Sequence, residues 1–213
     1  MDDEAEYRVI QNGYDGEVVR DLVEKLTSER SSRPRLLITY TGGLTNGRDL
    51  PLKALLDALR KLNQEGKESI QLRLIGCNYG WLSRQYGDLI AAGILEVKGL
   101  VSHEEAISAI LESDYALQLN AKEHPYLVST KIYESAICRV PAISLNYGGS
   151  IDALIKNHGL GYSLQVDDCC LVSFLQELPK DSTEKFAFDV EPFDHKNLAE
   201  RYGELIDELD ERS

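Results

Sequence analysis

A lysine and a glutamate, Lys131 and Glu134, lie one helical turn apart in the segment STKIYESAIC, which has helical character. Ser129 or Thr130 is placed to cap this helix. A lysine in the first turn opposes the preference of a helix N-terminus for negative charge, so a bound anion would supply the missing partner. The Glu134 carboxylate offers acceptor sites to paired hydroxyl groups. The alternative is an i,i+3 surface ion pair, which contributes only about 0.3 kcal/mol.

The loop TGGLTNGRDL combines small residues with a cation just before a predicted helix. Gly42 and Gly43 allow a phosphate to approach the backbone closely, and Arg48 can bind it through two hydrogen bonds. The spacing matches neither G-x-G-x-x-G nor a P-loop, so it indicates neither a nicotinamide cofactor nor P-loop chemistry. The alternative is a glycine turn followed by a surface arginine.

The segment GLVSHEE offers main-chain groups around Val101 and Ser102 that can contact a base. Ser102 and Glu105 also have capping-box spacing, so helix capping is the alternative, with His103 as a solvated first-turn residue. We find no Ser/His/Asp grouping, and we expect neither a metal nor another cofactor. The remaining histidines show no metal-ligand spacing: His124, His158 and His195.

Composition bounds the possible functions. The chain has 213 residues, 43% of them hydrophobic, and a net charge of −13, which opposes binding to nucleic acid or to an anionic membrane. No apolar run reaches the roughly 18 residues of a transmembrane helix, and the N-terminus lacks the pattern of a secretory signal. We therefore expect a cytoplasmic protein with reduced thiols. The cysteines form no C-x-x-C pair: Cys77, Cys138, Cys169 and Cys170.

Short apolar runs alternate with helical segments along most of the chain. One helical segment, LPLKALLDALRKL, places leucines on a single face. Such alternation predicts an α/β, doubly wound, Rossmann-like fold: a mostly parallel sheet of about six strands with helices on both faces. Ligands of such folds bind on loops at the carboxyl ends of the strands. The expected strands are 35–42, 70–76, 94–99, 114–120, 141–145 and 161–166.

Six stretches carry a family resemblance because they occur in a fixed order. Together they resemble the C-terminal, donor-binding domain of GT-B glycosyltransferases of family 4 (glycosyl transferases group 1), from about Tyr7 to Asp168. The stretches are VIQNGYD, ITYTGGL with GRDLPLKALLDAL, LRLIG, VKGLVSHEEAISAILESDYALQL, STKIYESAICRVPAISL and GLGYSLQVDD.

The resemblance implies that the ligand is a nucleotide-diphosphate sugar. Gly42 and Gly43 are then expected to lie against the donor diphosphate, and Arg48 is expected to bind it. Lys131 matches a lysine of the related T-K-x-x-E form, directed toward phosphate. Lys53 is a candidate for the family's accompanying lysine, although it falls inside the predicted helix.

The resemblance also implies contacts to the nucleoside and the sugar. Val101 and Ser102 correspond to the base-contacting segment, and Thr130 belongs to the donor-binding loop. Glu134 corresponds to the second glutamate of the family's paired motif, which holds the ribose. Tyr126 stands where the first glutamate would contact the donor sugar, a departure that puts the sugar and the retaining mechanism in question.

Enzymes of this family contain two Rossmann-like domains with the reaction in the cleft between them. We expect residues 1–30 to be an interdomain-linker remnant with a leading helix, 31–180 the donor-binding domain, and 181–213 a C-terminal segment with a helix. The expected partners are the nucleotide-sugar donor and a missing N-terminal acceptor domain, without which the chain should transfer no sugar. The alternatives are a nucleotide-sugar epimerase-like domain and a degenerate, non-catalytic nucleotide-binding or scaffold module.

Overall fold

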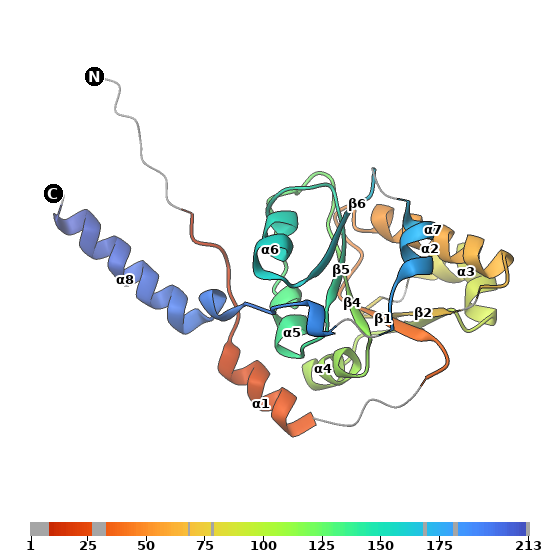
Figure 1. The fold of residues 1–213 in the computed structure, drawn as a ribbon, viewed down its shortest axis with the longest axis horizontal. Coiled ribbons are helices and arrows are strands. Elements are labelled where there is room, and N and C mark those ends of the chain that lie inside the picture. The colour runs from red at the N-terminus through yellow and green to blue at the C-terminus, as the bar shows by residue number, and fades with distance from the viewer. Residues whose placement is uncertain are drawn as a thin grey trace, which may run out of the picture.

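Six parallel strands form one sheet in the order β3-β2-β1-β4-β5-β6 (Figure 1). The computed structural model describes residues 9–26, 33–67, 69–77, 79–167, 170–180 and 183–211. The predicted doubly wound α/β fold is confirmed. The strands are β1 (Leu36–Thr41), β2 (Ile70–Ile75), β3 (Leu95–Lys98), β4 (Tyr115–Leu119), β5 (Ala142–Asn146) and β6 (Gly161–Gln165).

Helices cover both faces of the sheet, which is how an all-parallel sheet buries its apolar strands. One face carries α2 (Asp49–Gln64), α3 (Gly80–Ala91) and α7 (Leu171–Glu177). The other carries α4 (His103–Leu111), α5 (Lys131–Ile137) and α6 (Ser150–His158), with α1 (Gly16–Leu26) packed against α4 and α5. The chain ends with η1 (Thr183–Lys185), η2 (Glu191–Phe193) and α8 (His195–Glu211).

The core follows the hydrophobic pattern of the sequence. Every residue of β4 and β5 is buried, as expected for central strands covered on both faces. Cys77 and Cys138 are buried. The predicted leucine face of α2 is buried along its whole length: Leu52, Leu55, Leu56, Leu59 and Leu62.

The strand order reverses between the two central strands, β1 and β4. Ile38 of β1 is paired with Tyr115 of β4, but β1 leads through α2 to one side of the sheet and β4 leads through α5 to the other. The loops that leave β1 and β4 therefore start side by side at the carboxyl edge of the sheet. In doubly wound folds this switch point is where ligands bind.

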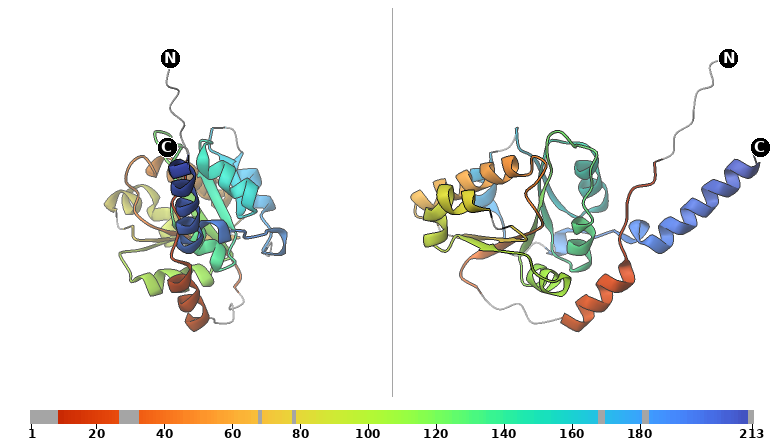
Figure 2. Two further views of the ribbon diagram at one scale, coloured as in Figure 1. Left: turned by 90° about the vertical axis from the view of Figure 1, so that its left-hand side faces the viewer. Right: turned by 180° about the vertical axis from the view of Figure 1, so that it is seen from behind.

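The segments that flank the sheet also contribute to the core. Val19 of α1 is buried with residues of α4. Tyr14 stacks on Tyr133 of α5 with the ring centroids 5.3 Å apart, and Phe193 stacks on the same ring at 5.2 Å. Figures 1 and 2 show α8 projecting away from the sheet and its covering helices. None of the helices in the described ranges is both long and apolar enough to cross a bilayer.

Candidate functional site

Three loops meet at the carboxyl edge of the sheet, around the switch point. A β-carbon at Gly47, after β1, would lie 3.1 Å from Cβ of Ala121 and 2.8 Å from a carboxylate oxygen of Glu123, both after β4. The main-chain N–H of Ser150, after β5, donates to the Pro125 carbonyl at 2.9 Å. The loops after β1, β4 and β5 thus form one continuous surface.

The glycine loop after β1 is held by hydrogen bonds to residues at the ends of β1 and β2. The Gly42 N–H donates to the carbonyl of Ile75 at 2.9 Å, and the Gly42 carbonyl accepts from the Cys77 thiol at 2.8 Å. The Tyr40 hydroxyl donates to the Gly43 carbonyl at 2.7 Å. Burial raises the pKa of Cys77 to about 12, so the thiol keeps its proton at neutral pH and remains a donor. The loop is therefore a fixed scaffold.

The two cations predicted beside this loop have different environments. Arg48 is half-buried at the start of α2, and no other residue in the described part of the chain forms an ion pair with it. Lys53 donates to the Asp49 carboxylate at 2.7 Å, and its ammonium lies 5.1 Å from the centroid of the Trp81 ring. Arg48 is thus available to bind an anion, whereas Lys53 already interacts with Asp49 and Trp81.

A buried carboxylate lies at the start of α5. The Glu134 side chain is only 10% exposed, and the Lys131 ammonium donates to its two oxygens at 3.2 and 3.4 Å. The predicted i,i+3 pair therefore exists, but on a buried carboxylate rather than on a solvated surface. Because α5 has only seven residues, any ligand affinity here depends on side chains more than on the helix dipole.

His103 also contacts this carboxylate, which the sequence did not indicate. Its Nε2 lies 3.3 Å from Oε1 of Glu134, so α4 and α5 contribute to one cluster. The sequence pattern suggested a solvated first-turn residue, and the side chain is indeed partly exposed. The capping box predicts that His103 lies in the first turn of α4, but it gives no information about which residue of α5 contacts this histidine.

The loop leading into α5 presents an exposed tyrosine in place of a buried side chain. Tyr126 is 67% exposed, and its hydroxyl lies 3.4 Å from Nδ1 of His124. Glu123, three residues earlier, brings a carboxylate to Gly47. Thr130 begins α5 without a side-chain capping bond, whereas the Ser129 hydroxyl accepts from the Lys131 N–H at 3.4 Å. Glu123 was not a predicted site residue; its only sequence signal is its place after a central strand.

The loop before α4 shows the predicted capping box. The Ser102 hydroxyl accepts from the Glu105 N–H at 3.2 Å, and the Glu105 carboxylate accepts from the Ser102 N–H at 2.8 Å. The Ser102 N–H is therefore already hydrogen-bonded within the helix cap. A base-contacting role for Val101 and Ser102 stays a prediction.

Replacing the Ser102 cap measures how much it contributes to the stability of the fold. Ser102→Ala is expected to lower the free energy of unfolding by about 1 kcal/mol, because an N–H at the start of α4 loses its acceptor. Thr130→Ala is the matched control and should change stability much less, since Thr130 caps nothing. Urea denaturation of both variants measures the difference. Equal losses would show that the Ser102 cap contributes no stability of its own.

No protein-family model matches the chain, and no curated protein matches it either. Solved structures do. A glycosyltransferase from Rickettsia africae is 18% identical with a TM-score of 0.61, over 97% of this chain and 58% of that one. A proposed UDP-N-acetylglucosamine 2-epimerase from Listeria monocytogenes is 14% identical with a TM-score of 0.56, over 92% and 52%.

A third similar structure is the pneumococcal O-GlcNAc transferase GtfA in complex with UDP and GlcNAc, at 13% identity and a TM-score of 0.52, over 86% of this chain and 38% of that one. The chain therefore spans between 38% and 58% of these three proteins. Such low identities establish the fold, but they do not establish the ligand or the activity. The chain is a six-stranded, Rossmann-like α/β domain of the kind found in GT-B glycosyltransferases.

Proposed function

We propose that this chain is the donor-binding domain of a glycosyltransferase and that it binds the nucleoside diphosphate of a nucleotide sugar. The observation that carries the proposal is the buried Glu134 carboxylate, held by Lys131 and His103 at the ligand-binding edge of a doubly wound sheet. Removing a carboxylate from water costs free energy, and buried carboxylates with specific charged partners are frequent at functional sites.

Each part of the ligand has a chemical counterpart in the site. Glu134 presents two acceptor oxygens, which suit the paired hydroxyls of a ribose. Arg48 and Lys131 carry the positive charge that a diphosphate needs, so the proposed binding mode uses side-chain cations in place of a metal. The scaffolded loop at Gly42 and Gly43 presents no side chain that blocks the phosphates. GtfA, a protein with this fold, was solved with UDP bound.

Sugar transfer is proposed to require a second, acceptor-binding domain. The solved glycosyltransferase from Rickettsia africae extends well beyond the part that this chain covers. In the complete enzyme, the cations at the diphosphate would stabilise the charge that develops on the leaving group, and the closed cleft would align the acceptor. The isolated chain is accordingly expected to bind nucleotide and to show no glycosyl transfer.

A thermal-shift screen tests the binding proposal. UDP, GDP, ADP and CMP are added to the chain, and a nucleotide present at 100 times its Kd should stabilise the fold by about 2.7 kcal/mol, which raises the midpoint by several degrees. Arg48→Ala should remove most of the shift. Lys53→Ala, which removes a committed cation from the same helix, should leave it nearly intact. If no nucleotide moves the midpoint, the scaffold alternative is favoured and the proposal fails.

An epimerase-like domain is the second candidate, favoured by the histidine beside a carboxylate. Nucleotide-sugar epimerases of related architecture require cleft carboxylates and a histidine, and His103, Glu134 and Glu123 supply those residue types. Incubating UDP-N-acetylglucosamine with the chain in deuterated water would report on it. Deuterium incorporation at the sugar C2 would favour the epimerase reading, and its absence together with UDP binding favours the transferase.

A further inference from the structure

A pocket of about 330 Å³ lies at the C-terminal end of α5. Its apolar lining comes from two segments that are distant in the sequence: Ala136 and Ile137 of α5, and Phe188 and Val190 before η2. The residues proposed to bind the donor lie at the carboxyl edge of the sheet, whereas α5 ends near the opposite edge, where β5 begins. None of them lines this pocket, which is therefore separate from the proposed donor site.

The hydroxyl group of Tyr14 is an unsatisfied donor at this pocket. Tyr14 lines the pocket but is only 3% exposed, and its hydroxyl oxygen has no hydrogen-bond partner in the described part of the chain. Arg20 lies nearby, but a guanidinium can only donate, so the hydroxyl proton has no acceptor. Burial raises the pKa of Tyr14 to about 12, so this proton is present at neutral pH. A ligand with an acceptor would relieve the cost of burying the donor.

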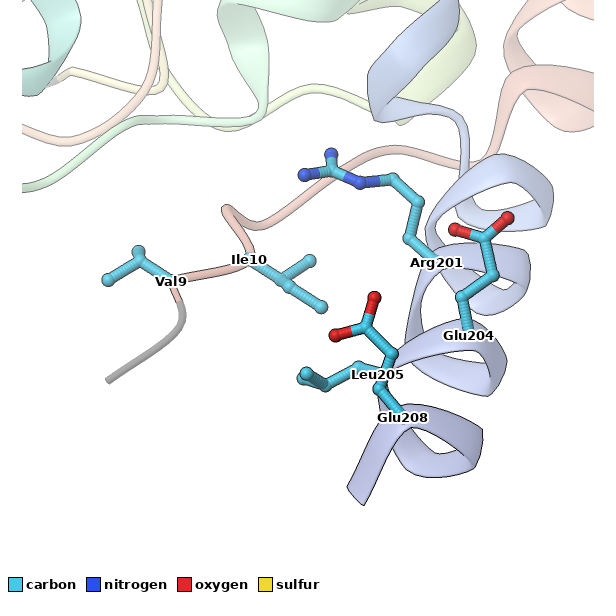
Figure 3. Close-up of a pocket in the computed structure, with 6 residues that line it drawn as sticks. All are labelled: Val9, Ile10, Arg201, Glu204, Leu205 and Glu208. Carbon is cyan, nitrogen blue, oxygen red and sulfur yellow. The ribbon is translucent and has the colours of Figure 1, made fainter. Parts of the chain in front are cut away.

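The groove between α8 and residues 9–10 is a useful contrast (Figure 3). Each residue that lines it in the described chain is exposed or half-buried, so water reaches its polar groups. Its charges are also mixed along the helix, since Arg201 is one turn from Glu204, and Glu204 is one turn from Glu208. That groove therefore gives no sign of an unmet need for a ligand.

Arg139 brings an available cation to the pocket at α5. It forms no ion pair within the described ranges, and its central guanidinium carbon lies 5.2 Å from the centroid of the Phe188 ring. Its backbone has φ 53°, a left-handed conformation that is uncommon for a residue other than glycine. Arg20, the other arginine of the pocket, is paired with Glu191 at 2.9 Å and with Asp194 at 3.2 Å. Only Arg139 is thus open to an anionic ligand.

The carboxylates of the pocket limit the charge that such a ligand can carry. Asp189 and Glu191 are both lining residues. They repel a dianion, such as a phosphate monoester, more strongly than they repel a singly charged group. The apolar side chains of the lining, in turn, favour a ligand that has a hydrophobic part.

We infer that this pocket is a second ligand site, which binds a small monocarboxylate with an apolar body. The carboxylate accepts hydrogen bonds from the Tyr14 hydroxyl and the Arg139 guanidinium, so it satisfies the buried donor and pairs with the available cation. The apolar body packs against the side chains at the end of α5 and before η2. Because the pocket shares no residue with the proposed donor site, either proposal can fail without the other.

Ligand-observed NMR with the full chain tests this site. The probes are 3-phenylpropanoate and 4-methylpentanoate, and at least one of them should bind with a Kd of about 1 mM or lower. The amide of that probe lacks the charge, acetate lacks the apolar body, and inorganic phosphate carries a second charge. Each of these three should bind about tenfold more weakly or worse. Binding by neither probe, or equal binding of acid and amide, would overturn the inference.

Tyr14→Phe tests the unsatisfied hydroxyl by two measurements. It should weaken binding of the probe about tenfold, and it should leave the thermal midpoint unchanged or raise it, because it removes a buried donor that has no acceptor. Tyr133→Phe is the control for stability: its ring stacks on Tyr14, but its hydroxyl donates to the Asn12 carbonyl at 3.0 Å, so its loss should lower the midpoint by a few degrees. Equal destabilisation by both variants would show that the Tyr14 hydroxyl already has a partner, contrary to the inference.

Arg139→Gln tests the cation and locates the probe on the protein. It should weaken binding of the carboxylate about tenfold or more and leave the already weak binding of the amide unchanged. Arg84→Gln, which removes an exposed arginine from α3, is the matched control and should change neither affinity. If the two variants bind the probe equally well, the carboxylate does not lie at Arg139 and the proposed site is wrong.

Discussion

Glu134→Gln is expected to weaken the binding of the preferred nucleoside diphosphate by about 10- to 100-fold, while pyrophosphate binds as well as before or more tightly. Hydrogen bonds from ligand hydroxyls to a charged acceptor contribute about 1.5–3 kcal/mol, which corresponds to that range in Kd. Pyrophosphate has no ribose, so it loses no hydrogen bond when Glu134 is replaced. Because Lys131 loses its anionic partner, it becomes more available to phosphate.

The measurement is isothermal titration of both ligands into the protein and its variant. Glu104→Gln is the matched control: this carboxylate lies beside His103 in the first turn of α4, but it is paired with Lys25 of α1. It should leave both affinities unchanged. Equal losses of nucleotide and pyrophosphate affinity in Glu134→Gln would mean that the carboxylate acts through the position of Lys131, and no loss at all would exclude a ribose contact.

The sequence predicts the sheet well because its signals are local. Each strand is a short apolar run between turn residues, and in α2 the leucine spacing alone specifies the buried face. The capping box at Ser102 and Glu105 is likewise complete within four residues. Such features require no knowledge of the neighbouring elements, and the structure contains all of them.

The site is harder to predict because its contacts join distant residues. His103 and Glu134 are separated by 31 positions and meet only because α4 and α5 pack on the same face of the sheet. The place of Glu123 against Gly47 depends on the pairing of β1 with β4. Periodicity also identifies α8 as an amphipathic helix without indicating that Leu198 is the residue buried at Gly13. In each case local pattern specifies the element, and tertiary packing specifies its neighbour.

The joint between the loops after β4 and β5 is a place where a single added methyl group should be strongly destabilising. Gly149 has φ 83° and ψ −153°, a backbone region that is open to glycine alone. A β-carbon there would overlap the carbonyl oxygen of Pro125 and lie 2.8 Å from its carbon. Gly149→Ala is therefore expected to lower the free energy of unfolding by about 3 kcal/mol, from backbone strain and the displaced loop together.

Gly148→Ala is a closely matched control. This neighbour has the same φ of 83°, but the nearest atom to its β-carbon, on Gln165, is 3.8 Å away, so it should cost only about 1 kcal/mol of backbone strain. Urea denaturation gives both values. Because Pro125 belongs to the loop that positions Lys131, Gly149→Ala should also weaken nucleotide binding, whereas Gly148→Ala should not. Equal costs for the two variants would mean that the Pro125 loop moves aside freely, and a site that depends on its position would then lose its structural basis.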